Sequence, residues 1–114
     1  MHKTFLILSL PIFMCLSCKE KQEKIPPGII SEKEMVSILT DFHLSEATAN
    51  QYNARYYSER VSTDELRLKV LSDHQQSLKD FSVSLSYYHN HSGKLEEIYR
   101  QVIDSIGAIQ RTIK

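Results

Sequence analysis

Apolar positions recur along the chain at the three- and four-residue spacing of amphipathic helices. The first such face lies between residues 35 and 56, and its members are Met35, Ile38, Phe42, Ser45, Ala49, Tyr52 and Tyr56. Residues at this spacing lie on one side of an α-helix. Ser31, with Glu34 three positions later, has the form of a capping box and predicts where this helix begins. The pattern becomes irregular over 55–62, where we expect the helix to end.

Two further helical faces follow. Thr63 is expected to cap a second helix, because the carboxylates of Asp64 and Glu65 favour a first turn. The apolar face of this helix is Leu66, Val70, Leu71, His74 and Leu78. A third helix is expected over 94–114, beginning near Ser92 or Gly93. Its face is Leu95, Ile98, Tyr99, Val102, Ile106, Ile109 and Ile113.

The stretch 81–87, Phe-Ser-Val-Ser-Leu-Ser-Tyr, can be interpreted in two ways. Strict alternation of apolar residues with serine is typical of a strand, but no second strand is evident to pair with it. At helical spacing, Phe81, Leu85 and Tyr88 share one face, with Asp80 as a cap. We favour a short helix. The chain is then an all-α domain, a small bundle of three to four helices joined by short loops.

The N-terminal segment differs from the rest. His2 and Lys3 precede a mostly apolar run over 5–16. This run is shorter than the roughly 20 residues that a membrane-spanning helix needs. A basic start, a short apolar run and a small residue before a cleavage site are typical of a secretory signal peptide. An uncleaved anchor is the alternative.

The cleavage site distinguishes a lipoprotein from an ordinary secreted protein. Leu16-Ser17-Cys18 resembles the bacterial lipobox, in which a small residue precedes a cysteine that is acylated, although Cys15 stands where leucine is usual. Cys18 fits better than Cys15, because Met14 is too large for the position before the cut. We expect residues 1–17 to be the signal peptide and Cys18 to carry the lipid. An ordinary signal with an incidental cysteine remains the other possibility.

The residues after Cys18 are suited to a tether. Residues 19–24 (KEKQEK) carry charges of both signs, and Ile-Pro-Pro-Gly follows at 25–28. We expect a lipidated tether over 18–30 and a helical domain over 31–114. Without its first 17 residues, the 114-residue chain keeps 97, which is enough for one small domain.

Charge and cysteine content exclude several classes of function. The chain has 14 Lys and Arg residues against 14 Asp and Glu residues. Nucleic-acid binding needs a basic surface to neutralise phosphates, so we expect no nucleic-acid partner. Both cysteines lie in the N-terminal segment, so the domain has no thiol for a disulfide, a catalytic nucleophile or a cysteine metal site.

A few residues could carry chemistry. Asp41, His43 and Glu46 lie close together on the first helix, and histidine with carboxylates can bind metal or transfer protons. Asp41 and His43 are two residues apart and do not share a helix face. The alternative is that these side chains form polar contacts where two helices pack together. His74, His89 and His91 could likewise gather a metal ion. His74 is better interpreted as a hydrogen-bonded core residue, and the other two as solvated. We expect no cofactor and no metal.

Six tyrosines are many for so short a chain. Exposed tyrosines suit a protein interface, because the ring adds contact area and the hydroxyl adds hydrogen bonds. For Tyr56, Tyr57 and Tyr87, interface and core edge are equally good interpretations. Tyr88 and Tyr99 are expected in the core.

Three blocks together resemble one family. They are Ile-Leu-Thr-Asp-Phe-His-Leu-Ser-Glu-Ala at 38–47, Phe-x-x-Ser-Leu-x-Tyr-Tyr at 81–88 and Glu-Ile-Tyr-x-x-Val at 97–102. The chain is similar over about 27–106 to the domain-of-unknown-function 4296 family of small Bacteroidetes lipoproteins. The resemblance implies an envelope lipoprotein with no established activity and no assigned catalytic residues. It also supports a helix at Phe81.

Similar proteins reach the cell surface when an acidic run follows the lipidated cysteine. The mixed charges at 19–21 therefore favour an outer-membrane protein that faces the periplasm.

These observations favour a membrane-anchored, non-enzymatic protein whose domain binds another envelope protein. The candidate interaction residues are Asp41, His43, Glu46, Tyr56, Tyr57 and Tyr87. A small metal-dependent enzyme, or a ligand carrier, that uses Asp41, His43 and Glu46 is the alternative.

Overall fold

A computed structural model describes residues 23–56 and 60–113. It contains helix α1 (Glu32–Arg55), α2 (Thr63–Asp73), α3 (Leu78–His89) and α4 (Ser92–Thr112). No strand occurs within the two described ranges, so the all-α prediction is confirmed, including the helical interpretation of residues 81–87. The expectations for residues 1–17, Cys18 and Tyr57 lie outside the described residues.

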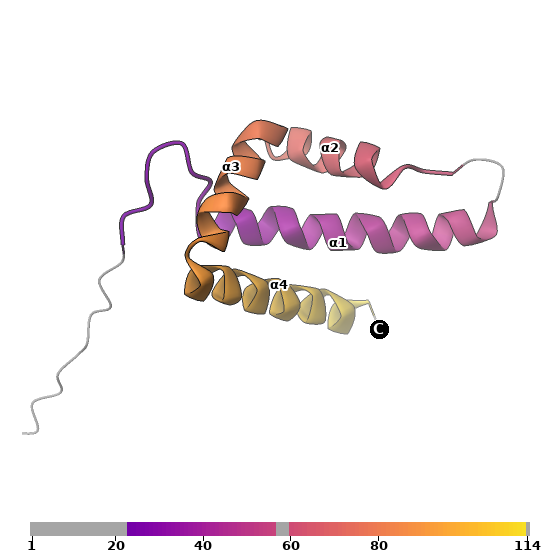
Figure 1. The fold of residues 1–114 in the computed structure, drawn as a ribbon. Coiled ribbons are helices and arrows are strands. Elements are labelled where there is room, and N and C mark those ends of the chain that lie inside the picture. Colours follow the sequence, from indigo (N-terminus) through magenta and orange to yellow (C-terminus); the bar gives the residue numbers. More distant parts are fainter. Residues whose placement is uncertain (1–22, 57–59, 114) are drawn as a thin grey trace, which may run out of the picture.

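The long helix α1 lies between α2 and α4 (Figure 1). Helix α2 runs back along α1, α3 crosses at the end where α1 begins, and α4 then runs in the same direction as α1 (Figure 1). Both α2 and α4 pack on α1, but within the described chain their own backbones do not approach each other. Side chains of all four helices line an open trough between α2 and α4, with α1 as its floor.

The N-terminal caps were only partly predicted. The Ser31 cap of α1 is confirmed, because its Oγ accepts a hydrogen bond from the Glu34 N–H at 3.2 Å. Helix α2 is preceded by Ser62, not capped by Thr63, and Ser62 makes no side-chain cap bond. Asp80 is not the cap of α3. That position belongs to Ser77, whose Oγ accepts from the Asp80 N–H at 3.0 Å and donates to the Asp80 carboxylate at 2.6 Å.

The predicted apolar face from Leu66 to Leu78 is wrong at its end. Helix α2 stops at Asp73, and Gln75 then adopts a left-handed backbone conformation with φ of 56°. The chain therefore changes direction before Leu78, which begins α3 instead of ending α2. Leu78 consequently leaves the core and is largely exposed.

The core is one apolar cluster contributed by all four helices and by the segment before α1. Its buried members are Ile30, Met35, Ile38, Leu39, Phe42, Val70, Leu71, Phe81, Tyr88, Ile98 and Val102. The rings of Phe42 and Phe81 meet edge to face at 5.3 Å and join α1 to α3. Tyr88 is buried as predicted, whereas Tyr99 is 41% exposed because it faces the trough.

Two side chains of α3 hold the segment that leads into α1. The Ile30 N–H donates to the Ser84 Oγ at 2.9 Å, and the Tyr88 hydroxyl donates to the Ile30 carbonyl at 2.7 Å. All of these groups are buried, so each bond prevents an unsatisfied polar atom. Burial, together with the nearby Glu32 and Tyr87, raises the pKa of Tyr88 to about 12 and keeps its hydroxyl a donor. The packed part of the chain thus begins before residue 31.

None of the helices in the described part of the chain is long and apolar enough to cross a membrane.

Candidate functional site

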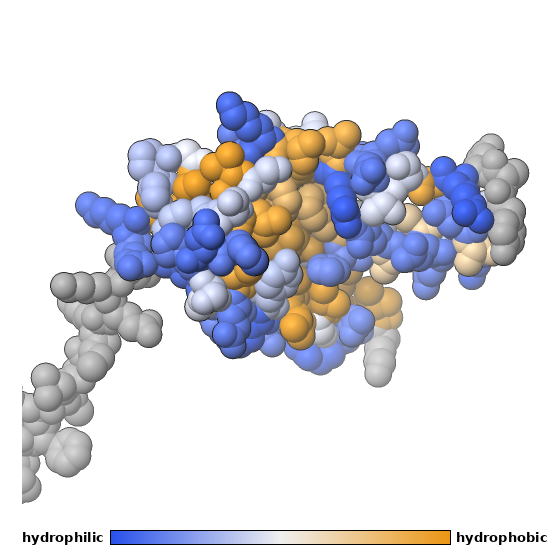
Figure 2. Space-filling model, viewed as in Figure 1, coloured by the Kyte–Doolittle hydropathy of each residue, from blue (hydrophilic) through white to orange (hydrophobic). Residues whose placement is uncertain are grey.

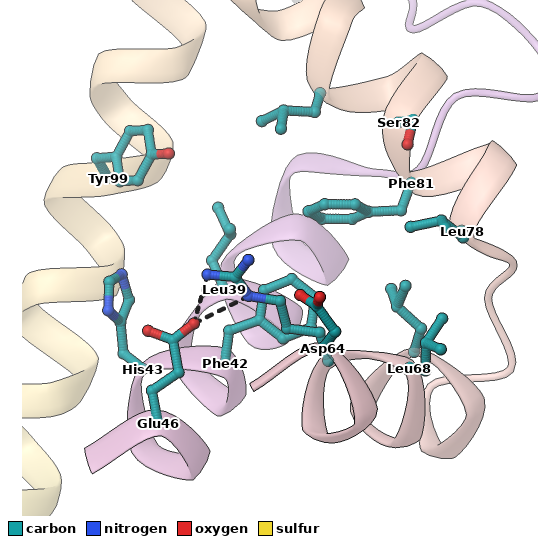
Figure 3. A pocket seen from close by; sticks show the side chains of 13 residues that line it. Leu39, Phe42, His43, Glu46, Asp64, Leu68, Leu78, Phe81, Ser82 and Tyr99 are labelled. Carbon is teal, nitrogen blue, oxygen red and sulfur yellow. Dashed lines mark hydrogen bonds and ion pairs between the residues drawn. The ribbon is translucent and has the colours of Figure 1, made fainter. Parts of the chain in front are cut away.

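The trough between α2 and α4 contains a groove, which we call the α1 groove. Its volume is about 580 Å³. Its lining residues are Leu39, Phe42, His43 and Glu46 of α1, Asp64, Arg67, Leu68 and Leu71 of α2, Leu78, Phe81, Ser82 and Leu85 of α3, and Tyr99 of α4. Most of these side chains are apolar (Figure 3). Apolar side chains also gather on the surface between α2 and α4 (Figure 2).

The walls of the α1 groove expose leucines to solvent. Leu68 of α2 is 52% exposed and Leu78 of α3 is 57% exposed. Both side chains line the groove, and neither is part of the buried core. Single exposed leucines are common on proteins, but several that converge on one concavity are typical of a binding surface.

Charged groups lie at one side of the groove. Arg67 donates from Nε and Nη2 to the same Glu46 oxygen, Oε1, at 2.9 and 2.6 Å. In the close view, Glu46 and Asp64 lie away from Ser82 (Figure 3). No described residue forms a hydrogen bond or ion pair with the Asp64 carboxylate. The one guanidinium pairs with Glu46 and leaves the Asp64 carboxylate uncompensated, so this side of the groove carries net negative charge.

A second polar feature lies outside the groove, where α2 ends against α1. Here His74 bridges two carboxylates of α1. Its Nδ1 lies 2.7 Å from a Glu34 oxygen, and its Nε2 lies 2.8 Å from an Asp41 oxygen. The His74 side chain is mostly buried, as predicted.

The bridge requires a protonated ring. Carboxylate oxygens only accept, whereas a neutral imidazole has a single N–H, so only the imidazolium donates to both partners. Burial lowers the pKa of His74, but the hydrogen bonds and negative charges of Asp41 and Glu34 outweigh burial and raise it above 6.5. With both nitrogens engaged, the ring has none left to bind a metal or a substrate.

This bridge makes stability depend on pH. Because the pKa of His74 is raised in the folded state, its stabilising effect is complete below the ordinary pKa of 6.5 and is lost as pH rises through the folded value. We expect the free energy of unfolding to fall by on the order of 1 kcal/mol over this range. Urea unfolding at a series of pH values from 6 to 9 measures it. His74→Gln should remove the decline, and an equal decline in that variant would contradict the assignment.

The structure does not bring Asp41, His43 and Glu46 together. Asp41 bonds to His74, whereas Glu46 pairs with Arg67 in the α1 groove. His43 is exposed and lies in the groove between Glu46 and Tyr99 (Figure 3). Only His43 and Glu46 therefore share a site, which follows from the helical spacing of three residues.

The other candidates are dispersed. Tyr56 is 53% exposed at the far end of α1 and stacks on Tyr52 at 4.8 Å. Tyr87 is half-buried against the core and stacks on His91 at 4.3 Å. Neither tyrosine lines the α1 groove. Among the described residues, no group of three or more His, Cys, Asp or Glu side chains is placed to hold a metal ion.

Sequence reasoning missed most of the groove. Asp64, Arg67, Leu68 and Leu78 line it, but the periodicity alone treated Leu78 as core and gave Leu68 no role. One signal was available, because Leu66 and Leu68 lie two apart and therefore on different sides of α2. A helix that is apolar on more than one side has more than one surface to cover.

Comparison with known proteins now identifies the chain. The family model described as "Domain of unknown function (DUF4296)" matches residues 26–112. The chain belongs to the DUF4296 family. No curated protein and no solved structure matches it. The matched region of this DUF4296 protein includes Ile30, so it contains both partners of the Ile30 contacts with Ser84 and Tyr88.

Proposed function

We propose that this DUF4296 protein is an envelope lipoprotein, attached through Cys18 to the outer membrane and facing the periplasm. A basic start, a short apolar run and Ser17 before Cys18 support the lipid anchor. The mixed charges after Cys18 favour the periplasmic side. Acyl chains stabilise attachment by about 0.8 kcal/mol per buried methylene, so several chains hold a protein of balanced charge without electrostatic help.

We assign the helical domain the function of binding another envelope protein, and the α1 groove carries this assignment. The groove is apolar, and exposed leucines form its walls. Its two long walls, α2 and α4, do not approach each other within the described chain, so an added apolar segment could pack between them. A bound segment would remove from water the side chains that the fold leaves exposed.

Ligand carriage is the second candidate, because the groove volume of about 580 Å³ is large enough. Sites for small molecules usually measure about 300–1,000 Å³. The structure gives no comparable support for function as a metal-dependent enzyme, because Asp41 bonds to His74 and does not line the groove with His43 and Glu46.

A charge placed in the groove tests the assignment. Leu68→Arg is expected to reduce the recovery of partner proteins from solubilised, crosslinked membranes by about tenfold. It replaces an apolar wall residue with a charged side chain that must be desolvated on docking, and that side chain lies one helical turn from Asp64 and can occupy its carboxylate. Val83→Arg is the matched control, since Val83 is 49% exposed on α3 and does not line the groove. Both substitutions are at exposed positions and should change stability by less than about 0.5 kcal/mol. Equal recovery with the two variants, measured by quantitative mass spectrometry, would contradict the assignment.

A further inference from the structure

We propose that the α1 groove binds the apolar face of a basic amphipathic helix from its partner protein, with a lysine or arginine of that helix paired to Asp64 and Glu46. This inference rests on the proposed function and specifies the chemistry of the partner. It follows from the shape of the groove, from its apolar walls and from the charges at its side.

The shape favours a helix. The floor of the groove is one helix, two other helices flank it, and α3 crosses at one end (Figure 1). Helical bundles fill such a space with the apolar face of a further helix. Here α1, α2, α4 and the bound helix would together form a four-helix arrangement. Recognition of this kind uses apolar anchors at positions i, i+3 or i+4, and i+7 of the bound helix.

The apolar walls define what the anchors touch. Leu68 of α2 and Leu78 of α3 contribute exposed methyl groups on the same side of the groove, and the rings of Phe42 and Phe81 form the buried base (Figure 3). Aliphatic or aromatic side chains of a bound helix would extend the existing contact between these two rings. Burial of this surface supplies affinity but does not select a partner.

The charged side chains of the groove determine which partner it prefers. The Asp64 carboxylate has no partner in the described chain. The hydrogen bonds from Arg67 both go to Oε1 of Glu46, and no described hydrogen bond uses Oε2. A lysine or arginine at the edge of the bound helix can pair with these oxygens. The two carboxylates of Asp64 and Glu46 outnumber the single guanidinium of Arg67 in the groove. Charge complementarity therefore favours a basic peptide over the carboxylate of a fatty acid or the phosphate of an anionic lipid.

Two synthetic peptides test this selection. Each is a helix of about four turns with leucines at spacings of three and four. One carries lysines beside the leucines, and the other carries glutamates at the same positions. Fluorescence anisotropy measures their binding to the full-length protein in nanodiscs of neutral phosphatidylcholine, with empty nanodiscs as the blank. We expect the lysine peptide to bind about tenfold more tightly than the glutamate peptide.

Charge reversal at two neighbouring positions in the first turn of α2, one inside the groove and one outside it, provides the matched comparison. Asp64→Lys should abolish the preference for the lysine peptide. Glu65→Lys makes the same change of charge in the first turn of α2 at a side chain outside the groove, and it should keep most of the preference. Both variants lose one carboxylate that favours the N-terminus of α2, so their stabilities should be similar.

Four outcomes would overturn the inference. They are equal binding of the two peptides, binding of neither, displacement of the lysine peptide by palmitate, and a dimer of the chain in analytical ultracentrifugation that Leu68→Arg dissociates. If both peptides bind equally and Leu68→Arg weakens both, the groove still docks helices and only the charge selection is wrong. If the wild-type protein binds neither peptide while Leu68→Arg still lowers partner recovery from membranes, the partner is not a basic helix but the proposed function stands.

Discussion

Replacing Tyr88 with alanine is expected to lower the free energy of unfolding by about 3–5 kcal/mol, the range for loss of a buried aromatic ring. Tyr88 is fully buried, and its ring packs edge to face on Tyr87 at 5.2 Å. Its hydroxyl also holds the Ile30 carbonyl. Domains of this size have a total stability of only about 5–15 kcal/mol, so the variant should be largely destabilised. Urea unfolding followed by the negative circular-dichroism signal of α-helices at 222 nm measures the change.

Two control substitutions separate the parts of this effect. Tyr88→Phe keeps the ring and removes only the hydroxyl, so it leaves the Ile30 carbonyl without its donor and should cost about 1–3 kcal/mol. Tyr56→Ala removes an exposed tyrosine and should cost less than about 0.5 kcal/mol. If Tyr88→Ala proves as mild as Tyr56→Ala, the contact between α3 and the segment before α1 does not stabilise the fold.

Replacing Cys18 with serine is expected to abolish acylation. Only the thiol can accept the lipid, and serine keeps the size of the side chain while removing the sulfur. Labelling of growing cells with an alkyne analogue of palmitate, followed by purification of the protein, should give strong label in the wild type and background label in the variant. Cys15→Ser is the matched control and should keep its label, because the proposed cut lies after Ser17 and before Cys18. Loss of label in Cys15→Ser alone would move the anchor to Cys15.

Sequence periodicity predicted the helices well because each helix buries one face against the same core. The face from Met35 to Ala49 and the face around Ile98 and Val102 both supply buried residues. Local capping was predicted where the cap is a simple short-range motif, as at Ser31. It failed at Ser77 and at the end of α2, because the left-handed backbone at Gln75 is a property of the turn that no periodic pattern contains.

The candidate site could not be predicted to the same extent, because its contacts join distant parts of the chain. His74 bonds to Glu34 and Asp41, which are 40 and 33 positions away. Arg67 pairs with Glu46 across 21 positions. A helical pattern predicts which residues face the core but does not predict which polar side chains meet between helices. The grouping of Asp41 with His43 and Glu46 was wrong for this reason. Asp41 bonds to His74, whereas Glu46 bonds to Arg67.

The Ile30 contacts connect the fold to the proposed anchor. The expected tether ended at residue 30, yet Ile30 is buried and bonded to α3 through Ser84 and Tyr88. Residues 23–31 join the bundle at the end where α3 crosses α1 (Figure 1). In our proposal, the chain that leads to the lipidated Cys18 therefore leaves the domain at a packed point beside α3.

Photocrosslinking in intact cells tests the central claim, binding of a partner protein in the α1 groove, most directly. A photoreactive amino acid is placed at Leu68 in one strain and at the exposed control position Val83 in another. The account predicts that Leu68 crosslinks to one reproducible peptide with apolar residues three and four apart and a neighbouring lysine or arginine, and that Val83 does not. Identical crosslinks from the two positions, or crosslinks from Leu68 to lipid alone, would contradict it.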